Sequence, residues 1–199
     1  MEKRNDRELK ILSPVFNQTE DTPLENIVQE IKNHARILYE SKQYLCAEAV
    51  LISMNSALGG GLTEKQAISM AAPFCIGMGD SGCLCGALSG AVLSSGLFTG
   101  SENAYACRKK MRKQSRMLHD NFKRVNGATC CRSLSKNIVH DKKARFRHCA
   151  ELTANSAEMA ARLVLAEKPE LRSSKHRKTS RKYNLITGLP LRIFRWLFH

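Results

Sequence analysis

The chain has 199 residues, 43% of them hydrophobic and 25% charged, and its 32 Lys and Arg outnumber its 18 Asp and Glu, which leaves a formal net charge of +14. This composition excludes a globally disordered chain, a collagen-like repeat and a small domain held together only by disulfides. The apolar stretch over residues 68–97 is interrupted by glycines and by Asp80, so it is typical of a protein core and not of a membrane span.

The N-terminal part of the chain predicts a polar segment followed by an amphipathic helix. Residues 1–21 are polar and aperiodic, so we expect a flexible segment, and they lack the apolar region of a secretory signal, which predicts a cytoplasmic protein. Thr22, Pro23 and Glu25 form a capping pattern for the first helix. Its apolar residues recur at helical spacing: Leu24, Ile27, Val28, Ile31, Ala35, Leu38 and Tyr39.

Three further helices are predicted in the middle of the chain. The first covers residues 44–58 and ends at the glycines 59–61, and the second begins with the capping pair Thr63 and Gln66 and runs to about residue 75. A glycine-rich turn then leads to a helix that begins near Cys83 and is rich in Gly, Ala and Ser. Because small side chains let a neighbouring backbone approach closely, we expect this helix at the centre of the fold.

The rest of the predicted core is also helical. Ser101 is the expected cap of a basic helix over 102–125, a short segment follows at 130–135, and a long helix over 141–168 stops before Pro169. The chain shows no alternating pattern of strand length. The sequence therefore predicts an all-α, compact multi-helix bundle with three parts: a flexible segment at 1–21, a helical cysteine-containing domain at 22–171 and a basic tail at 172–199.

Two regions contain most of the positive charge. Residues 108–147 hold 14 basic and 2 acidic side chains, and residues 172–199 hold eight basic and no acidic ones. A solvated helix face is the ordinary explanation of the first region. In the tail, Ile193, Trp196 and Leu197 share one helical face beside arginines, a pattern that suits an anionic membrane surface, although these side chains can also fold back onto the core. We do not expect nucleic acid as the partner.

The eight cysteines indicate redox or metal chemistry, because structural disulfides are rare in the cytosol. Cys46, Cys83 and Cys85 lie near predicted helix starts, where a thiolate is favoured, so we expect activated thiols there and a lowered pKa at Cys85 in particular. Cys75 and Cys107 lie on apolar stretches, and we expect them to pack as small hydrophobic residues.

Three motifs together resemble the C_GCAxxG_C_C family of redox-active proteins. They are residues 46–50 (Cys-Ala-Glu-Ala-Val), 77–79 (Gly-Met-Gly) and 85–90 (Cys-Gly-Ala-Leu-Ser-Gly), and further cysteines follow in the order of that family. The resemblance covers about residues 25–170. It implies that the four signature cysteines, which are catalytic or bind a cofactor or metal, are Cys46, Cys85, Cys131 and Cys149. Cys130 is the alternative to Cys131 as thiol or metal ligand.

The signature cysteines are separated by 39, 46 and 18 residues, so they can act together only if the fold gathers them at one site. Three uses stay open: an iron–sulfur cluster, a zinc site, and thiol–disulfide exchange that needs no cofactor. The first hypothesis is thus electron transfer or disulfide exchange with a redox partner protein. A hypothesis of another class is a binding module for an anionic partner, in which the cysteines pack or bind structural zinc.

Overall fold

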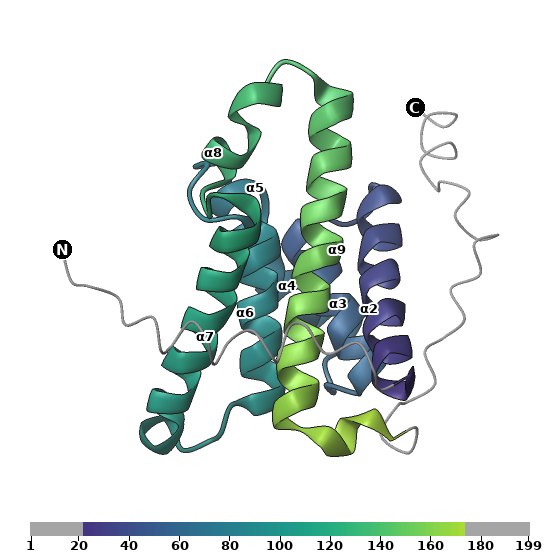
Figure 1. Ribbon diagram of the computed structural model, residues 1–199, viewed down its shortest axis with the longest axis vertical. Coiled ribbons are helices and arrows are strands. Elements are labelled where there is room, and N and C mark those ends of the chain that lie inside the picture. Colours follow the sequence, from purple (N-terminus) through teal and green to yellow (C-terminus); the bar gives the residue numbers. More distant parts are fainter. Residues whose placement is uncertain (1–21, 174–199) are drawn as a thin grey trace, which may run out of the picture.

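A computed structural model describes residues 22–173 (Figure 1). Within this range the elements are α2 (Thr22–Glu40), α3 (Cys46–Leu58), α4 (Glu64–Ala71), η1 (Ala72–Phe74), α5 (Cys75–Met78), α6 (Gly86–Thr99), α7 (Ala104–Asn126), α8 (Cys131–Ser135), η2 (Lys136–Ile138), α9 (Lys142–Glu167) and η3 (Pro169–Arg172). No strand occurs among these residues, and the predicted all-α bundle is confirmed. The predicted N-terminal segment and nearly all of the tail lie outside the described residues.

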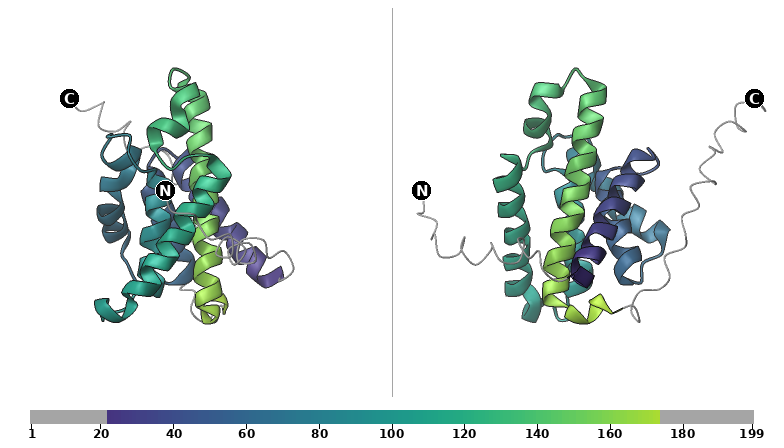
Figure 2. Two further views of the ribbon diagram at one scale, coloured as in Figure 1. Left: turned by 60° about the vertical axis from the view of Figure 1, so that its left-hand side comes forward. Right: turned by 45° about the vertical axis from the view of Figure 1, so that its right-hand side comes forward.

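The bundle is organised around α9, which runs through its middle in Figure 1 and contacts α2, α3, α6 and α7. The two turned views in Figure 2 show α7 on one side of α9 and α2 on the other. Helix α6 contacts α3, α7 and α9, so the small-residue helix lies at the centre, as its composition predicts. None of the helices in the described range combines the length and the apolar character that crossing a membrane requires.

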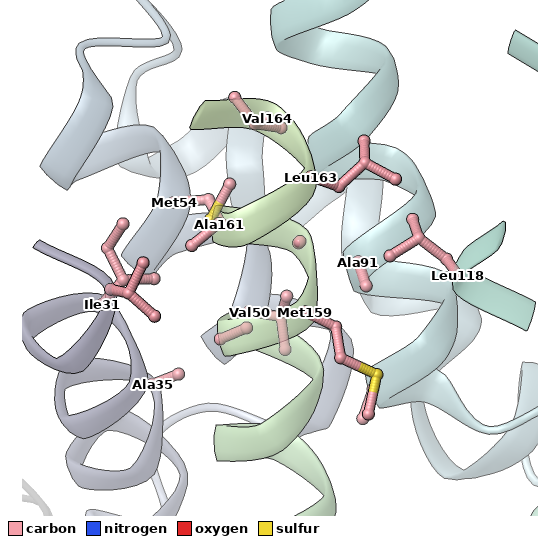
Figure 3. Close-up of a cluster of buried hydrophobic side chains, with 14 of the residues drawn as sticks. Ile31, Ala35, Val50, Met54, Ala91, Leu118, Met159, Ala161, Leu163 and Val164 are labelled. Carbon is pink, nitrogen blue, oxygen red and sulfur yellow. The ribbon is translucent and has the colours of Figure 1, made fainter. Parts of the chain in front are cut away.

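The core fills the space between these helices with short side chains. Figure 3 shows Leu163 and Met159 of α9 directed toward Ala91 of α6 and Leu118 of α7. At Gly90 of α6, an added Cβ would lie 2.8 Å from the carbonyl oxygen of Ala47 and 3.0 Å from the Cβ of Val50. The backbones of α6 and α3 therefore touch at this point, and a glycine is required there.

Ion pairs join α2 to α9 along one side of the bundle, and we call them the α2–α9 charge seam. Lys32 Nζ lies 2.7 Å from Glu158 Oε2, and Arg36 forms a two-point pair with Glu151. The guanidinium of Arg162, which is buried, contacts Glu158 at 2.8 Å and Glu25 at 2.9 Å. These pairs fix α2 and α9 in an antiparallel arrangement.

Several helix boundaries differ from the sequence prediction. Helix α6 begins at Gly86, not near Cys83, because Gly82 (φ 73°) and Leu84 (φ 46°) are left-handed and cannot continue a helix. Helix α3 begins at Cys46. The cap of α7 is Asn103, whose Oδ1 accepts a hydrogen bond from the Ala106 N–H, and not Ser101.

Candidate functional site

A cavity of about 380 Å³ lies at the end of the bundle that is uppermost in Figure 1. Its walls come from the end of α2, the starts of α3 and α6, the short helices α5 and α8, and the first turns of α9. Four of the eight cysteines line it, namely Cys46, Cys85, Cys131 and Cys149. The fold thus brings together the four cysteines that the resemblance singles out, and their chemical role stays a prediction.

Helix starts place three of these cysteines. Cys46 is the first residue of α3, Cys85 is the cap residue of α6, and Cys131 is the first residue of α8, whereas Cys149 lies about two turns into α9. The choice between Cys130 and Cys131 is resolved by position, because Cys131 lines the cavity and the thiol of Cys130 instead contacts the Gly82 carbonyl oxygen at 2.9 Å.

Glycines let the cysteine-bearing segments approach one another. At Gly86, an added Cβ would lie 2.5 Å from Cys46 Sγ and 2.7 Å from the Phe74 carbonyl oxygen. At Gly77, which has φ 70°, an added Cβ would lie 2.7 Å from the Cβ of Cys131. Any side chain at either position would push a thiol away from its present place.

The segment from α5 to α6 has an unusual backbone. Ile76, Met78, Asp80 and Leu84 all have positive φ values, between 46° and 66°, although only glycine adopts this region without strain. For Ile76 the conformation directs its N–H to the sulfur of Cys46, where it stabilises the thiolate. Strain at a branched side chain that contacts a cavity thiol is typical of a functional site.

Hydrogen bonds hold this strained segment against the start of α8. The Cys85 N–H donates to the Thr129 carbonyl oxygen at 2.7 Å, and the Arg132 N–H donates to that of Gly82 at 3.0 Å. The Arg132 guanidinium also donates to the Ser81 carbonyl oxygen at 2.9 Å. Because these bonds join residues almost 50 positions apart, they fix Cys85 and Cys131 relative to each other.

Burial dominates the electrostatics of three cavity thiols. It raises the pKa of Cys85 to about 12, and it also raises the pKa values of Cys131 and Cys149. The expected lowering at Cys85 is therefore wrong for this arrangement. The N–H groups of Leu88 and Ala87 at the start of α6 do favour the Cys85 thiolate, but loss of solvent outweighs them.

Sequence reasoning missed a contact of Cys75. This residue is buried, as its apolar surroundings predict, but it also accepts a hydrogen bond from the Cys46 thiol. That bond, together with the N–H groups of Glu48 and Ala47, lowers the pKa of Cys75, and the same bond raises the pKa of Cys46. The apolar pattern around Cys75 carries no signal for this contact, since 29 residues separate the two cysteines.

Tyr39 is a second residue that the sequence did not indicate, because its position in the apolar face of α2 suggested packing alone. Its hydroxyl donates a hydrogen bond to Cys149, and its ring stacks on Phe146 with 5.2 Å between centroids. Arg145 and Lys142 also line the cavity, and the positive charge of Arg145 favours the thiolate forms of Cys131 and Cys149. The cavity therefore combines thiols with a hydroxyl donor and cations.

The remaining cysteines lie elsewhere. Cys83 is exposed, and Cys107 is half-buried near the start of α7. The backbone N–H of Ser133 lowers the pKa of the Cys130 thiol. Across residues 22–173, no three or more His, Cys, Asp or Glu side chains are grouped so that they could hold a metal ion.

Comparison with known proteins identifies the family. Residues 44–163 match the family model described as "Putative redox-active protein (C_GCAxxG_C_C)". No curated protein and no solved structure matches the chain. The matched segment contains all eight cysteines and every helix from α3 to α8, together with most of α9. Since it covers more than half of the 199 residues, the chain belongs to the C_GCAxxG_C_C family of redox-active proteins, and the predicted resemblance is confirmed.

Proposed function

We propose that this protein transfers electrons by thiol–disulfide exchange at the cavity, with a disulfide-bearing redox partner in the cytoplasm. The observation that carries the proposal is that Cys46, Cys85, Cys131 and Cys149, which come from four separate segments, line one cavity. Exchange requires thiols that can approach within disulfide distance, and it requires no cofactor. The match to a redox-active family supports the same class of function.

The surroundings of the thiols suit this chemistry. An attacking or leaving sulfur carries negative charge, and the cavity supplies groups that stabilise it: the Tyr39 hydroxyl at Cys149, the Arg145 guanidinium and the Ile76 N–H. Burial keeps the other thiols protonated at neutral pH. Reaction is thereby limited to partners that reach into the cavity.

An iron–sulfur cluster is the second candidate function, because four cysteine thiols at one cavity are the donor set that such clusters use. Cys46, Cys85, Cys131 and Cys149 would hold it, and the cluster would supply one-electron chemistry. Zinc, held by the same cysteines, is the corresponding structural alternative.

Anaerobic purification followed by metal, sulfide and thiol analysis tests the proposal. We expect a protein without stoichiometric iron or zinc, in which reduction by a dithiol reagent raises the thiol count by two per chain. A Cys107→Ser variant, altered outside the cavity, should give the same gain. Stoichiometric iron and acid-labile sulfide with visible absorption bands would replace disulfide exchange with the cluster, and zinc alone would favour a structural role.

The membrane proposal concerns residues 172–199, nearly all of which lie outside the described residues. We propose a peripheral contact between this basic tail and an anionic membrane surface, since each Lys or Arg near such a surface adds about 1 kcal/mol of binding free energy. Co-sedimentation with vesicles of anionic lipid tests it: the full chain should bind, and a chain that ends at residue 171 should not. Equal binding of both chains would assign the contact to the basic surface of the helical domain.

A further inference from the structure

We propose that Cys75 and Cys46 form the disulfide couple of this site, with Cys46 as the attacking thiol and Cys75 as the resolving thiol. Cys75 is not one of the four signature cysteines. The inference rests on the proposed exchange function and specifies which two of the eight cysteines carry it out.

The geometry at Gly86 brings the two residues together. The point where a Cβ of Gly86 would lie is 2.5 Å from Cys46 Sγ and 3.4 Å from the Cα of Cys75, so this sulfur and this Cα are less than about 6 Å apart. The Cys46 thiol also donates a hydrogen bond to the Cys75 sulfur. Disulfides join residues whose Cα atoms are about 4.4–6.8 Å apart, so little movement is needed to close the bond.

Accessibility assigns the two roles. Cys46 is half-buried and lines the cavity, so its sulfur can be reached by a disulfide that enters from solvent. Cys75 is only 4% exposed and lies behind Cys46, where the N–H groups of Glu48 and Ala47 point to its sulfur. A buried sulfur that N–H groups hold in place can be reached by Cys46 and not by the substrate.

The reaction balances with a substrate disulfide, R–S–S–R, as the oxidant. The Cys46 sulfur attacks one substrate sulfur while its proton passes to Cys75; the S–S bond breaks, a Cys46–S–S–R mixed disulfide forms, and the first R–S⁻ leaves. Cys75 then attacks the Cys46 sulfur, gives its proton to the departing second R–S⁻, and closes the Cys46–Cys75 disulfide. The substrate gains two electrons, and the dithiol loses two. A dithiol reductant reverses the sequence.

Disulfide mapping of the unmodified chain tests the couple directly. The reduced protein is treated with oxidised glutathione, quenched with acid, and digested with trypsin and a protease that cleaves before Asp. Cleavage before Asp80 separates Cys75 from Cys83, Cys85 and Cys107, while trypsin isolates Cys46 in the peptide 43–65. We expect a cross-link between peptides 43–65 and 66–79 as the first disulfide to form.

A variant tests the order of the two steps. In Cys75→Ser, the mixed disulfide of glutathione on Cys46 should accumulate roughly tenfold or more above its level in the unchanged protein, because the intramolecular attack that removes it is lost. Cys107→Ser is the matched control and should behave as the unchanged protein does.

The outcomes separate the couple from the function on which it rests. Disulfides confined to Cys85, Cys131 and Cys149, with Cys46 and Cys75 still reduced, would overturn the couple and leave exchange at the cavity intact. A protein in which no cavity cysteine is oxidised by glutathione disulfide would overturn both. Mapping uses the unchanged chain, so the result does not depend on how well the variant folds.

Discussion

Two glycines one turn apart on α6 mark two regions built on different principles. Gly90 lies in the middle of the bundle, where an added Cβ would meet the backbone and side chain of α3, and the neighbouring side chains are fully buried. Gly86 lies at the cavity end, where an added Cβ would meet the sulfur of Cys46. The middle is held by close packing and ion pairs, whereas the cavity end contains strained backbone and open volume. Stability and reactivity are thus located in separate parts of one small domain.

The largest predicted effect concerns the packed middle. We expect Gly90→Val to lower the free energy of unfolding by about 3 kcal/mol, because the carbonyl oxygen of Ala47 and the Cβ of Val50 leave no room and belong to a packed helix. Urea denaturation followed by circular dichroism measures this change.

Gly96→Ala on the same helix is the matched control for that substitution. At Gly96 an added Cβ meets nothing within 4 Å, so alanine should raise stability by about 0.5–1 kcal/mol through its better helix propensity. If both variants are equally stable, the close contact between α6 and α3 is not the reason for the glycine at position 90.

The charge seam should show the next largest effect. Arg162→Met is expected to lower the free energy of unfolding by about 2 kcal/mol at pH 7, because Glu158 and Glu25 lose a buried partner. Arg162 holds the pKa of Glu25 below its ordinary value of 4.5, so this stabilisation is present above pH 4.5 and is lost as the pH falls through the lowered folded-state pKa. The stability difference between variant and unchanged protein should therefore narrow below pH 4.5. A difference that stays constant down to pH 3 would contradict this explanation.

Thiol reactivity distinguishes the cavity from its surroundings. We expect iodoacetamide to modify Cys130 about ten times faster than its neighbour Cys131 at pH 7, because the Ser133 N–H lowers the pKa of Cys130 while burial raises that of Cys131. Fragmentation of the tryptic peptide 125–132, which contains both residues, resolves the two sites. Faster labelling of Cys131 would show that the cavity activates its thiols more strongly than solvent exposure does.

The smallest effect concerns Tyr39. In Tyr39→Phe the hydroxyl that donates to Cys149 is lost while the ring can still stack on Phe146, so the pKa of Cys149 should rise and its alkylation rate at pH 8 should fall about threefold. Labelling of Cys130 serves as the internal control and should not change. An unaltered rate at Cys149 would mean that the hydroxyl has no influence on this thiol.

The sequence predicts most of the bundle and the membership of the cavity, but not its interior contacts. Helical periodicity identifies α2 and α9, and the cysteine pattern indicates the four residues that line the cavity. The pairing of Cys46 with Cys75 depends on left-handed turns at non-glycine residues such as Ile76, which no propensity rule predicts. The high pKa of Cys85 depends on burial by distant segments, and a helix-start rule considers only the local N–H groups.

The wide spacing of the cavity cysteines also has a consequence for the order of folding. Cys46 and Cys75 meet through contacts among α3, η1 and α5, which need only a short loop to close, whereas Cys149 joins them from more than 100 residues away. Contacts of long sequence separation carry a larger entropic cost and form late. On a ribosome, Cys46 and Cys75 leave the exit tunnel well before α9 can cover them. We therefore expect the nascent chain to pass through a stage in which this pair is open to oxidation, and a cell that keeps its thiols reduced protects the protein during synthesis.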